Sequence, residues 1–212
     1  MIAAINRLYR SVFCRGGHGV HSPFVFDLIT TVIEERSSYY CYDSLSTVRK
    51  QLQQNMHKFC FTEREDRLLF RLANRFKPRT IYMMGSDLGL APLYLTAYSK
   101  HARCVVVEPD KLDIIDNNID LIVWGRSFSG ASGGRGNVHE VFNEETFEKF
   151  LPYINDESVM VISGINASRK STETWKRICA SPRVTVTLDL YTLGIVFFNP
   201  KLHRKMYKSL VL

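Results

Sequence analysis

The sequence predicts an α/β protein with a doubly wound, mostly parallel sheet. Two observations support this prediction. From Thr80 onward, short apolar runs alternate with segments of helical periodicity, which is typical of parallel strands joined by helical crossovers. Near the end of the chain, two apolar runs are separated only by Tyr191 and Thr192, which is the spacing of a C-terminal antiparallel hairpin.

Residues 1–78 are expected to form a helical N-terminal region that packs on the core and ends at Pro78. Ser22 followed by Pro23 is typical of an N-cap and a first helical residue. The expected helices span residues 1–13, 23–36, 44–58 and 63–76. The first of these is amphipathic and basic, and it could dock on the chain itself, on a partner subunit or on a membrane surface.

Residues 79–212 are expected to form the sheet domain. Apolar runs predict strands at 80–84, 104–107, 120–124, 158–163, 183–190 and 193–198. Helical periodicity predicts helices at 90–99, 144–151 and 172–179. The segment 127–136 is rich in glycine and serine, which is typical of a loop.

The formal charge of +7 comes from the two ends of the chain. Residues 1–20 carry three arginines and no acid, and residues 200–212 carry four basic residues and no acid. These ends could attract anions in a salt-dependent way. The rest of the chain is neutral overall, so we expect no specific nucleic-acid partner.

Five cysteines without a CxxC pair argue against a disulfide framework or a zinc site and favour a reducing compartment. No apolar run reaches the roughly 18 residues of a membrane span. Two arginines interrupt the apolar start of the chain, unlike in a signal peptide. We therefore expect a cytoplasmic protein without a transmembrane segment, and a homo-oligomer is compatible with the sequence.

The strand at 80–84 leads into a glycine turn, GSDLG at 85–89, and then into a helix. Glycine lets the backbone approach a ligand closely. Glu108 ends the next strand, 23 residues after Gly85, where an acid can accept both hydroxyls of a ribose. Asp87 takes the place of the middle glycine of the dinucleotide fingerprint, which disfavours a nicotinamide cofactor. The alternative is a turn whose glycines serve packing alone.

Three groups of residues resemble a known family. IYMMGSDLGL at 81–90 resembles the first motif of class I S-adenosylmethionine (SAM)-dependent methyltransferases, particularly the catechol-type O-methyltransferase branch. VEPD at 107–110 resembles their second motif. GVHSPFVF at 19–26 and the stretches at 151–159 and 189–198 resemble a bacterial subgroup of that branch.

This resemblance implies a Rossmann-like sheet that binds SAM at the carboxyl ends of its first strands. Gly85, Ser86 and Gly89 would line the methionine part, with Asp87 in the same turn, and Glu108 would bind the ribose. The implied chemistry is methyl transfer to a small substrate. Because the sulfonium already activates the methyl group, positioning would carry most of the catalysis.

Several residues depart from the family pattern. Met83 stands two positions before Gly85, where the family usually has an acid that contacts the methionine ammonium. Trp124 and Gly125 follow the fourth strand, and the residues at 163–166 follow the fifth. The metal-dependent branch has carboxylates at both places. Magnesium usually needs one or two carboxylates, so we expect no metal site.

A deletion also distinguishes the chain. Only residues 109–119 separate Glu108 from the next predicted strand, where the family fits two helices and a strand. A parallel crossover alone needs about a dozen residues, so we expect the third strand to be missing. In the numbering of the complete family sheet, the expected order is 2-1-4-5-7-6.

The sequence leaves the methyl acceptor and the general base unassigned. His21 could act as a base, although its position before a helix favours a structural role. Three functions stay open. The chain is a metal-independent SAM-dependent methyltransferase of a small substrate, a catalytically inactive relative with a binding or assembly role, or a binder of anionic surfaces through its basic ends.

Overall fold

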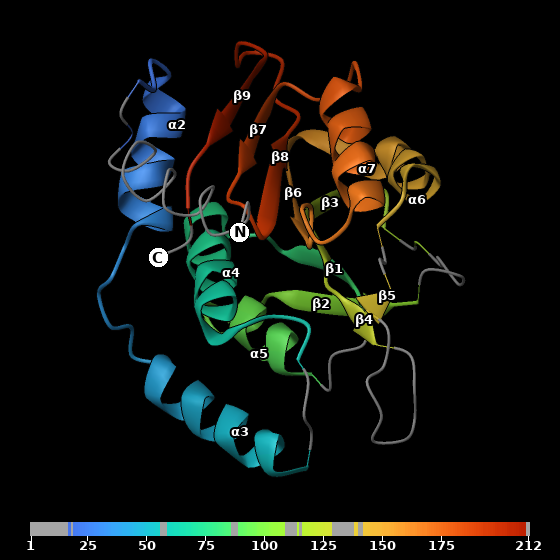
Figure 1. Cartoon of the computed structure of the whole chain (residues 1–212). Helices are drawn as coiled ribbons and strands as arrows, with labels where there is room; N and C mark the ends of the chain where they lie inside the picture. The colour runs from blue at the N-terminus through green and yellow to red at the C-terminus, as the bar shows by residue number, and fades with distance from the viewer. Residues whose placement is uncertain are drawn as a thin grey trace.

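The computed structural model describes Gly17 and residues 19–55, 59–85, 89–108, 114, 116–128, 138–139 and 142–210. The helix expected over residues 1–13, the basic N-terminus and most of the segment 127–136 lie outside these residues. Within the described part, helices cover both faces of a central sheet (Figure 1). The α/β architecture expected from the sequence is therefore confirmed.

Seven strands form the sheet in the order β2-β1-β3-β6-β8-β7-β9. Their bounds are β1 Thr80–Met84, β2 Arg103–Val107, β3 Ile119–Trp124, β6 Ile154–Ser163, β7 Val186–Asp189, β8 Leu193–Phe197 and β9 Lys205–Lys208. The strands from β2 to β6 are parallel neighbours, β8 is antiparallel to both β6 and β7, and β9 is parallel to β7. A separate antiparallel pair joins β4 (Ser127–Phe128) and β5 (Val138–His139).

The first six positions of this order agree with the expected order 2-1-4-5-7-6. β2 forms one edge, and no strand lies beyond it in the described part of the chain. β9 at the opposite edge was not predicted, because only Tyr207 of its four residues is buried. The basic C-terminal segment is therefore partly a strand of the sheet. Lysine is common at such edges because it disfavours pairing with another chain.

The helices follow the predicted ranges with local differences at their ends. Their bounds are α2 Pro23–Leu28, α3 Tyr42–Asn55, α4 Glu63–Phe76, α5 Leu90–Thr96, α6 Glu144–Phe150 and α7 Arg169–Ala180. α2 continues as a π-helical turn, Ile29–Ile33, so this helical segment ends before the expected Arg36. α6 continues as a 3₁₀ turn, Leu151–Tyr153. Thr62 and Glu65 form a capping box that fixes the start of α4.

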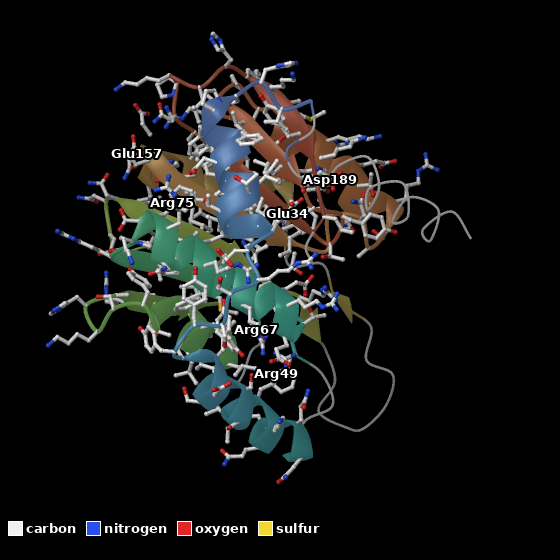
Figure 2. All side chains as sticks on the ribbon, turned by 90° about the vertical axis from the view of Figure 1, so that its left-hand side faces the viewer. Glu34, Arg49, Arg67, Arg75, Glu157 and Asp189 are labelled. Carbon is white, nitrogen blue, oxygen red and sulfur yellow. The ribbon has the colours of Figure 1, made fainter. Side chains whose placement is uncertain are left out.

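Neighbouring residues of β1 face opposite layers of the protein. Ile81 and Met83 pack in the layer that contains α2, α4 and α5. Tyr82 and Met84 pack in the layer that contains α6 and α7. All four side chains are fully buried, as expected for a central strand covered on both faces. α2 and α4 lie side by side on the first face (Figure 2).

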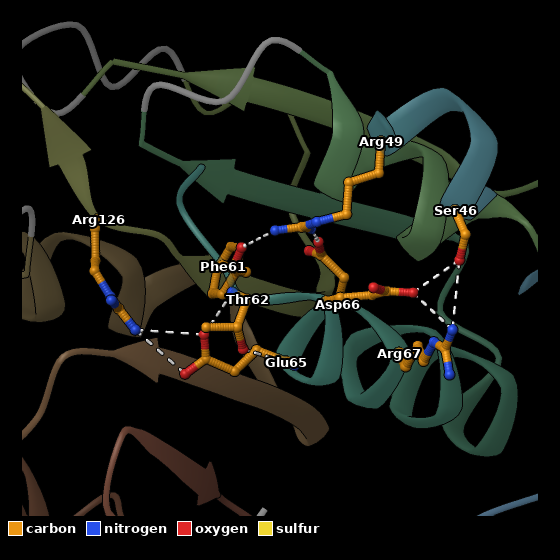
Figure 3. Close-up of polar contacts among 9 residues, drawn as sticks. Ser46, Arg49, Phe61, Thr62, Glu65, Asp66, Arg67 and Arg126 are labelled. Atoms are coloured by element: carbon orange, nitrogen blue, oxygen red, sulfur yellow. Dashed lines mark hydrogen bonds and ion pairs between the residues drawn. The ribbon is translucent and has the colours of Figure 1, made fainter. Parts of the chain in front are cut away.

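A buried ion pair connects α3 with α4 (Figure 3). Arg49 donates to Asp66, and their side chains are only 8% and 1% exposed. Arg49 also donates to the Phe61 carbonyl oxygen at 2.9 Å. A smaller apolar cluster, which includes Tyr42 and Tyr94, completes the contact of α3 with α4 and α5. This buried ion pair is a polar restraint on the position of α3, together with the hydrogen bond from Ser46 to Glu63 at 2.8 Å.

The Arg49–Asp66 pair provides a test of this restraint. Asp66→Ala would leave the Arg49 charge buried without its partner, so we expect the free energy of unfolding to fall by about 3–5 kcal/mol. The double variant Arg49→Met/Asp66→Leu should recover part of that loss. Asp27→Ala is the control, because Asp27 pairs with Arg75 on the exposed surface and should cost less than about 1 kcal/mol. Equal losses in urea denaturation for the two aspartates would contradict this expectation.

Gly194 of β8 provides a second test, of the packing under α7. A Cβ at this position would lie 2.6 Å from two ring atoms of Trp175. We expect Gly194→Ala to lower the free energy of unfolding by about 1–3 kcal/mol through overpacking. The same substitution on a Trp175→Leu background should cost clearly less, since the ring is gone. An additive double-mutant cycle would show that the two residues do not interact.

Candidate functional site

The carboxyl ends of four strands meet at one edge of the sheet, which we call the carboxyl edge. The register pairs there are Met84 with Val107, Met84 with Trp124, and Trp124 with Ile162. The positions that follow these pairs therefore lie side by side in the order Glu108, Gly85, Gly125 and Ser163. Ligands of open α/β sheets bind outside this edge, so these four residues define the candidate site.

The two glycines of the predicted turn have different surroundings. Gly85 has φ +122°, and a Cβ there would lie 3.2 Å from the backbone of Gly125 and 3.3 Å from the carbonyl oxygen of Arg126. Gly89 has φ +87°, and among the described residues no heavy atom lies within 4 Å of its Cβ position. Gly85 is therefore needed where two strand ends pack closely, whereas no described residue fills the space beside Gly89. Ser86 and Asp87 lie outside the described residues.

Glu108 follows β2 directly and is exposed. The strand register places it beside Gly85, as the sequence spacing predicted. The two candidate contacts of a nucleoside ligand are thus neighbours along the edge.

Arg126 is the residue of this edge that sequence reasoning missed (Figure 3). Its Nε donates to Ser163 Oγ at 3.1 Å. Its Nη2 contacts both carboxylate oxygens of Glu65, each at 3.3 Å. The Glu65 side chain is 3% exposed and that of Arg126 is 29% exposed. In the sequence, Glu65 is one of the acids expected in the first turn of a helix, which gave no reason to assign it to a site. Its contact with Arg126 becomes visible only in the folded chain.

The segment before α4 also covers the carboxyl edge. The Cys60 thiol is fully buried and donates to the Arg126 carbonyl oxygen at 2.7 Å. The Cys60 Cβ lies 3.1 Å from the position that a Cβ at Gly125 would occupy. The N-terminal helical region therefore contributes side chains to the candidate site rather than only covering the sheet.

Other side chains stand at or just after the ends of β3 and β6, where the resemblance would place the metal-binding carboxylates. These side chains make contacts within the fold. Trp124 is fully buried and packs edge-to-face on Phe150, with ring centroids 5.9 Å apart. Ser163 holds Arg126, and Asn166 donates to the Tyr191 carbonyl oxygen at 2.9 Å. In the described ranges, no group of three histidine, cysteine, aspartate or glutamate side chains could hold a metal ion.

The β7–β8 turn closes the edge beside β6. Tyr191 has φ +75°, a conformation that is uncommon for a residue other than glycine. Asp189 accepts a hydrogen bond from the Tyr191 backbone N–H at 2.8 Å, and the Gly164 backbone N–H donates to the Thr192 carbonyl oxygen at 2.7 Å. These contacts explain how a hairpin forms without the usual Asn-Gly turn.

His21 lies at the opposite end of the sheet. The Phe24 ring, three residues later, is 5.1 Å from that of Phe197. Phe197 pairs with Val159, four residues before Ser163. His21 itself is exposed, and its neighbour Ser22 supplies the N-cap of α2. This placement favours the structural role of this segment and not a base at the carboxyl edge.

The basic C-terminal residues also have structural partners. Arg204 Nη2 donates to the carbonyl oxygens of Cys179, Ala180 and Ser181 at 3.2, 2.6 and 2.9 Å, where α7 ends. Such a contact satisfies terminal carbonyl groups and complements the helix dipole. No helix of the described chain has both the length and the apolar character that crossing a membrane requires.

Comparison with known proteins identifies the fold. No protein-family model and no curated protein matches the sequence. Among solved structures, a putative caffeoyl-CoA O-methyltransferase from Staphylococcus aureus has a TM-score of 0.54 at 12% identity, over 74% of this chain and 92% of that one. TomG from Streptomyces achromogenes, an O-methyltransferase of tomaymycin synthesis in complex with SAM, has a TM-score of 0.50 at 10% identity, over 91% and 98%.

A third similar structure is the S-adenosylhomocysteine (SAH)-bound methyltransferase PaMTH1 from Podospora anserina, with a TM-score of 0.50 at 10% identity, over 78% of this chain and 91% of that one. The resemblance read from the sequence motifs is thus confirmed at the level of structure. Over most of its length, the chain has the fold of SAM-dependent O-methyltransferases of the caffeoyl-CoA and catechol type.

Proposed function

We propose that this chain binds SAM at its carboxyl edge and transfers the methyl group to a small-molecule acceptor without a metal ion. The observation that carries the proposal is the neighbouring placement of Gly85 and Glu108 at this edge, in a fold shared with a SAM complex. Bound SAM would supply an already activated methyl group, so the protein's contribution is to position it.

The residues proposed to hold SAM are those of the glycine turn and the acid beside it. Gly85, Ser86, Asp87 and Gly89 would form the wall along the methionine part, and Glu108 would accept the ribose hydroxyls. The described residues of this set fit such a ligand. No described residue fills the space beside Gly89, and the exposed Glu108 carboxylate can accept two hydrogen bonds.

Metal independence is supported by the charge that Arg126 brings to the edge. Its guanidinium joins the ends of β3 and β6 through the contact with Ser163. A guanidinium is positively charged and has no acceptor atom that could ligate a metal, so this side chain disfavours a divalent cation at the ends of β3 and β6. We therefore propose that the Arg126 guanidinium, and not a metal ion, supplies the positive charge at this edge.

The proposal extends to the domain organisation. We propose that residues 1–78 pack as a helical region on a methyltransferase-type domain of residues 79–212. We also propose that the third strand of the complete family sheet is missing, since β2 and β3 are joined by residues 108–118 only. The adenine side of the site would then be shorter than in the complete sheet.

A catalytically inactive relative with a binding or assembly role is the second candidate. It is favoured by Met83, which is fully buried in the core and offers no charge to the methionine ammonium. Cofactor binding without transfer to any acceptor would identify this alternative.

Calorimetric titration of the purified chain with SAM and SAH tests the proposal. We expect both to bind, and Glu108→Ala to weaken binding by about 1–3 kcal/mol, roughly fivefold to more than a hundredfold, because the ribose hydroxyls lose their acceptor. Glu148→Ala is the matched control, since Glu148 is an exposed acid of α6 and should leave binding unchanged. Absence of binding at millimolar ligand would refute the proposal, and an unaffected Glu108→Ala variant would show that the site lies elsewhere.

A further inference from the structure

We propose that Arg126 binds the carboxylate of the methionine part of SAM. This inference rests on the proposed function, because it assumes that SAM occupies the carboxyl edge. It assigns the binding of the SAM carboxylate to Arg126, a residue that no sequence motif indicated. Four features of Arg126 support it: its position, its fixed orientation, its remaining hydrogen-bond donors and its exposure.

The position of Arg126 follows from the backbone. Its carbonyl oxygen lies 3.3 Å from the Cβ position of Gly85, the first glycine of the turn proposed to line the methionine part. The Arg126 side chain then extends along the edge to Ser163 at the end of β6. A ligand that extends along the edge from Glu108, past Gly85, to the end of β6 would bring its carboxylate to this guanidinium.

The guanidinium is held before any ligand binds. Ser163 fixes its Nε, and Glu65 fixes its Nη2. Glu65 is itself oriented by its hydrogen bond from the Thr62 backbone N–H at 2.8 Å, within the capping box of α4. A pre-oriented guanidinium loses little conformational entropy on binding, which increases the affinity for a carboxylate of matching geometry.

These contacts leave hydrogen-bond donors available. A guanidinium has five N–H donors, and within the described part of the chain no hydrogen bond from Arg126 Nη1 is found. The side chain is 29% exposed, whereas its counterion Glu65 is 3% exposed. The exposed side of the group can therefore donate to a carboxylate while the buried side remains paired with Glu65.

Arg49, another arginine of this polar network, cannot take the same role. It is turned toward Asp66 and the Phe61 carbonyl oxygen, and its side chain is 8% exposed. Figure 3 shows Arg49 and Arg126 on opposite sides of the start of α4, while a third arginine, Arg67, pairs with Glu63. Of the three, Arg126 contacts Ser163 at the end of β6. The network thus offers one accessible guanidinium to the edge.

The test compares two ligands, one with the amino acid group that carries the carboxylate and one without it. SAH carries the amino acid group, whereas 5′-methylthioadenosine keeps the adenosine and the thioether without it. By calorimetry, we expect Arg126→Met to weaken SAH binding about tenfold or more and to leave 5′-methylthioadenosine binding unchanged. Arg126→Lys should recover part of the SAH affinity, since it keeps the charge but not the planar fork.

Arg75→Met is the matched control. Arg75 lies on α4, pairs with Asp27 and is 52% exposed (Figure 2). This variant also loses an ion-paired arginine, but one that lies away from the carboxyl edge, so SAH binding should not change. Thermal unfolding of each variant reports whether it is folded. SAH affinity that is unchanged in Arg126→Met, or an equal loss for both ligands, would overturn the inference while the proposed function stands. If neither ligand binds the wild-type chain, the proposed function fails as well.

Discussion

The parallel register of β1 with β2 and β3 is the constraint on which the candidate site depends. It aligns Glu108, Gly85 and Gly125 along one edge, although they come from three separate strands. The register is strongly specified because β1 is buried on both faces. A shift by one residue would exchange the side chains of its two faces and place Tyr82 and Met84 in the layer of α4. The packing of the core thus also fixes the geometry of the edge.

A second consequence is that the N-terminal helices belong to the site. Cys60 and Glu65, on either side of the start of α4, both contact Arg126. Burying the Glu65 carboxylate is costly unless it is paired and hydrogen-bonded. Arg126 and the Thr62 backbone N–H supply those contacts. The position of α4 on the sheet and the orientation of the guanidinium therefore depend on each other.

The sequence predicted the features that have a local cause. Continuous apolar runs predicted the buried strands β1, β3 and β6. The spacing from Gly85 to Glu108 predicted that these two residues are neighbours at the ends of adjacent strands. Features that need distant partners were missed. Arg126 and Glu65 are 61 residues apart, so no short motif contains them. β9 was missed because a lysine at each end masks a strand with one buried side chain. Tyr191 adopts a left-handed conformation that its neighbours impose, not its own preference.

The departures from the family pattern at the carboxyl edge are connected. A residual site from which only the ligating acids had been lost would leave polar groups without partners. Instead, Ser163 accepts from Arg126, and Asn166 donates to the β7–β8 turn. A fixed positive side chain at this edge disfavours a divalent cation there, so the position of Arg126 agrees with our proposal of methyl transfer without a metal ion. A partly exposed guanidinium that is held in place is suited to an anionic group, which is the physical reason for proposing that Arg126 binds a ligand carboxylate in addition to its contacts within the fold.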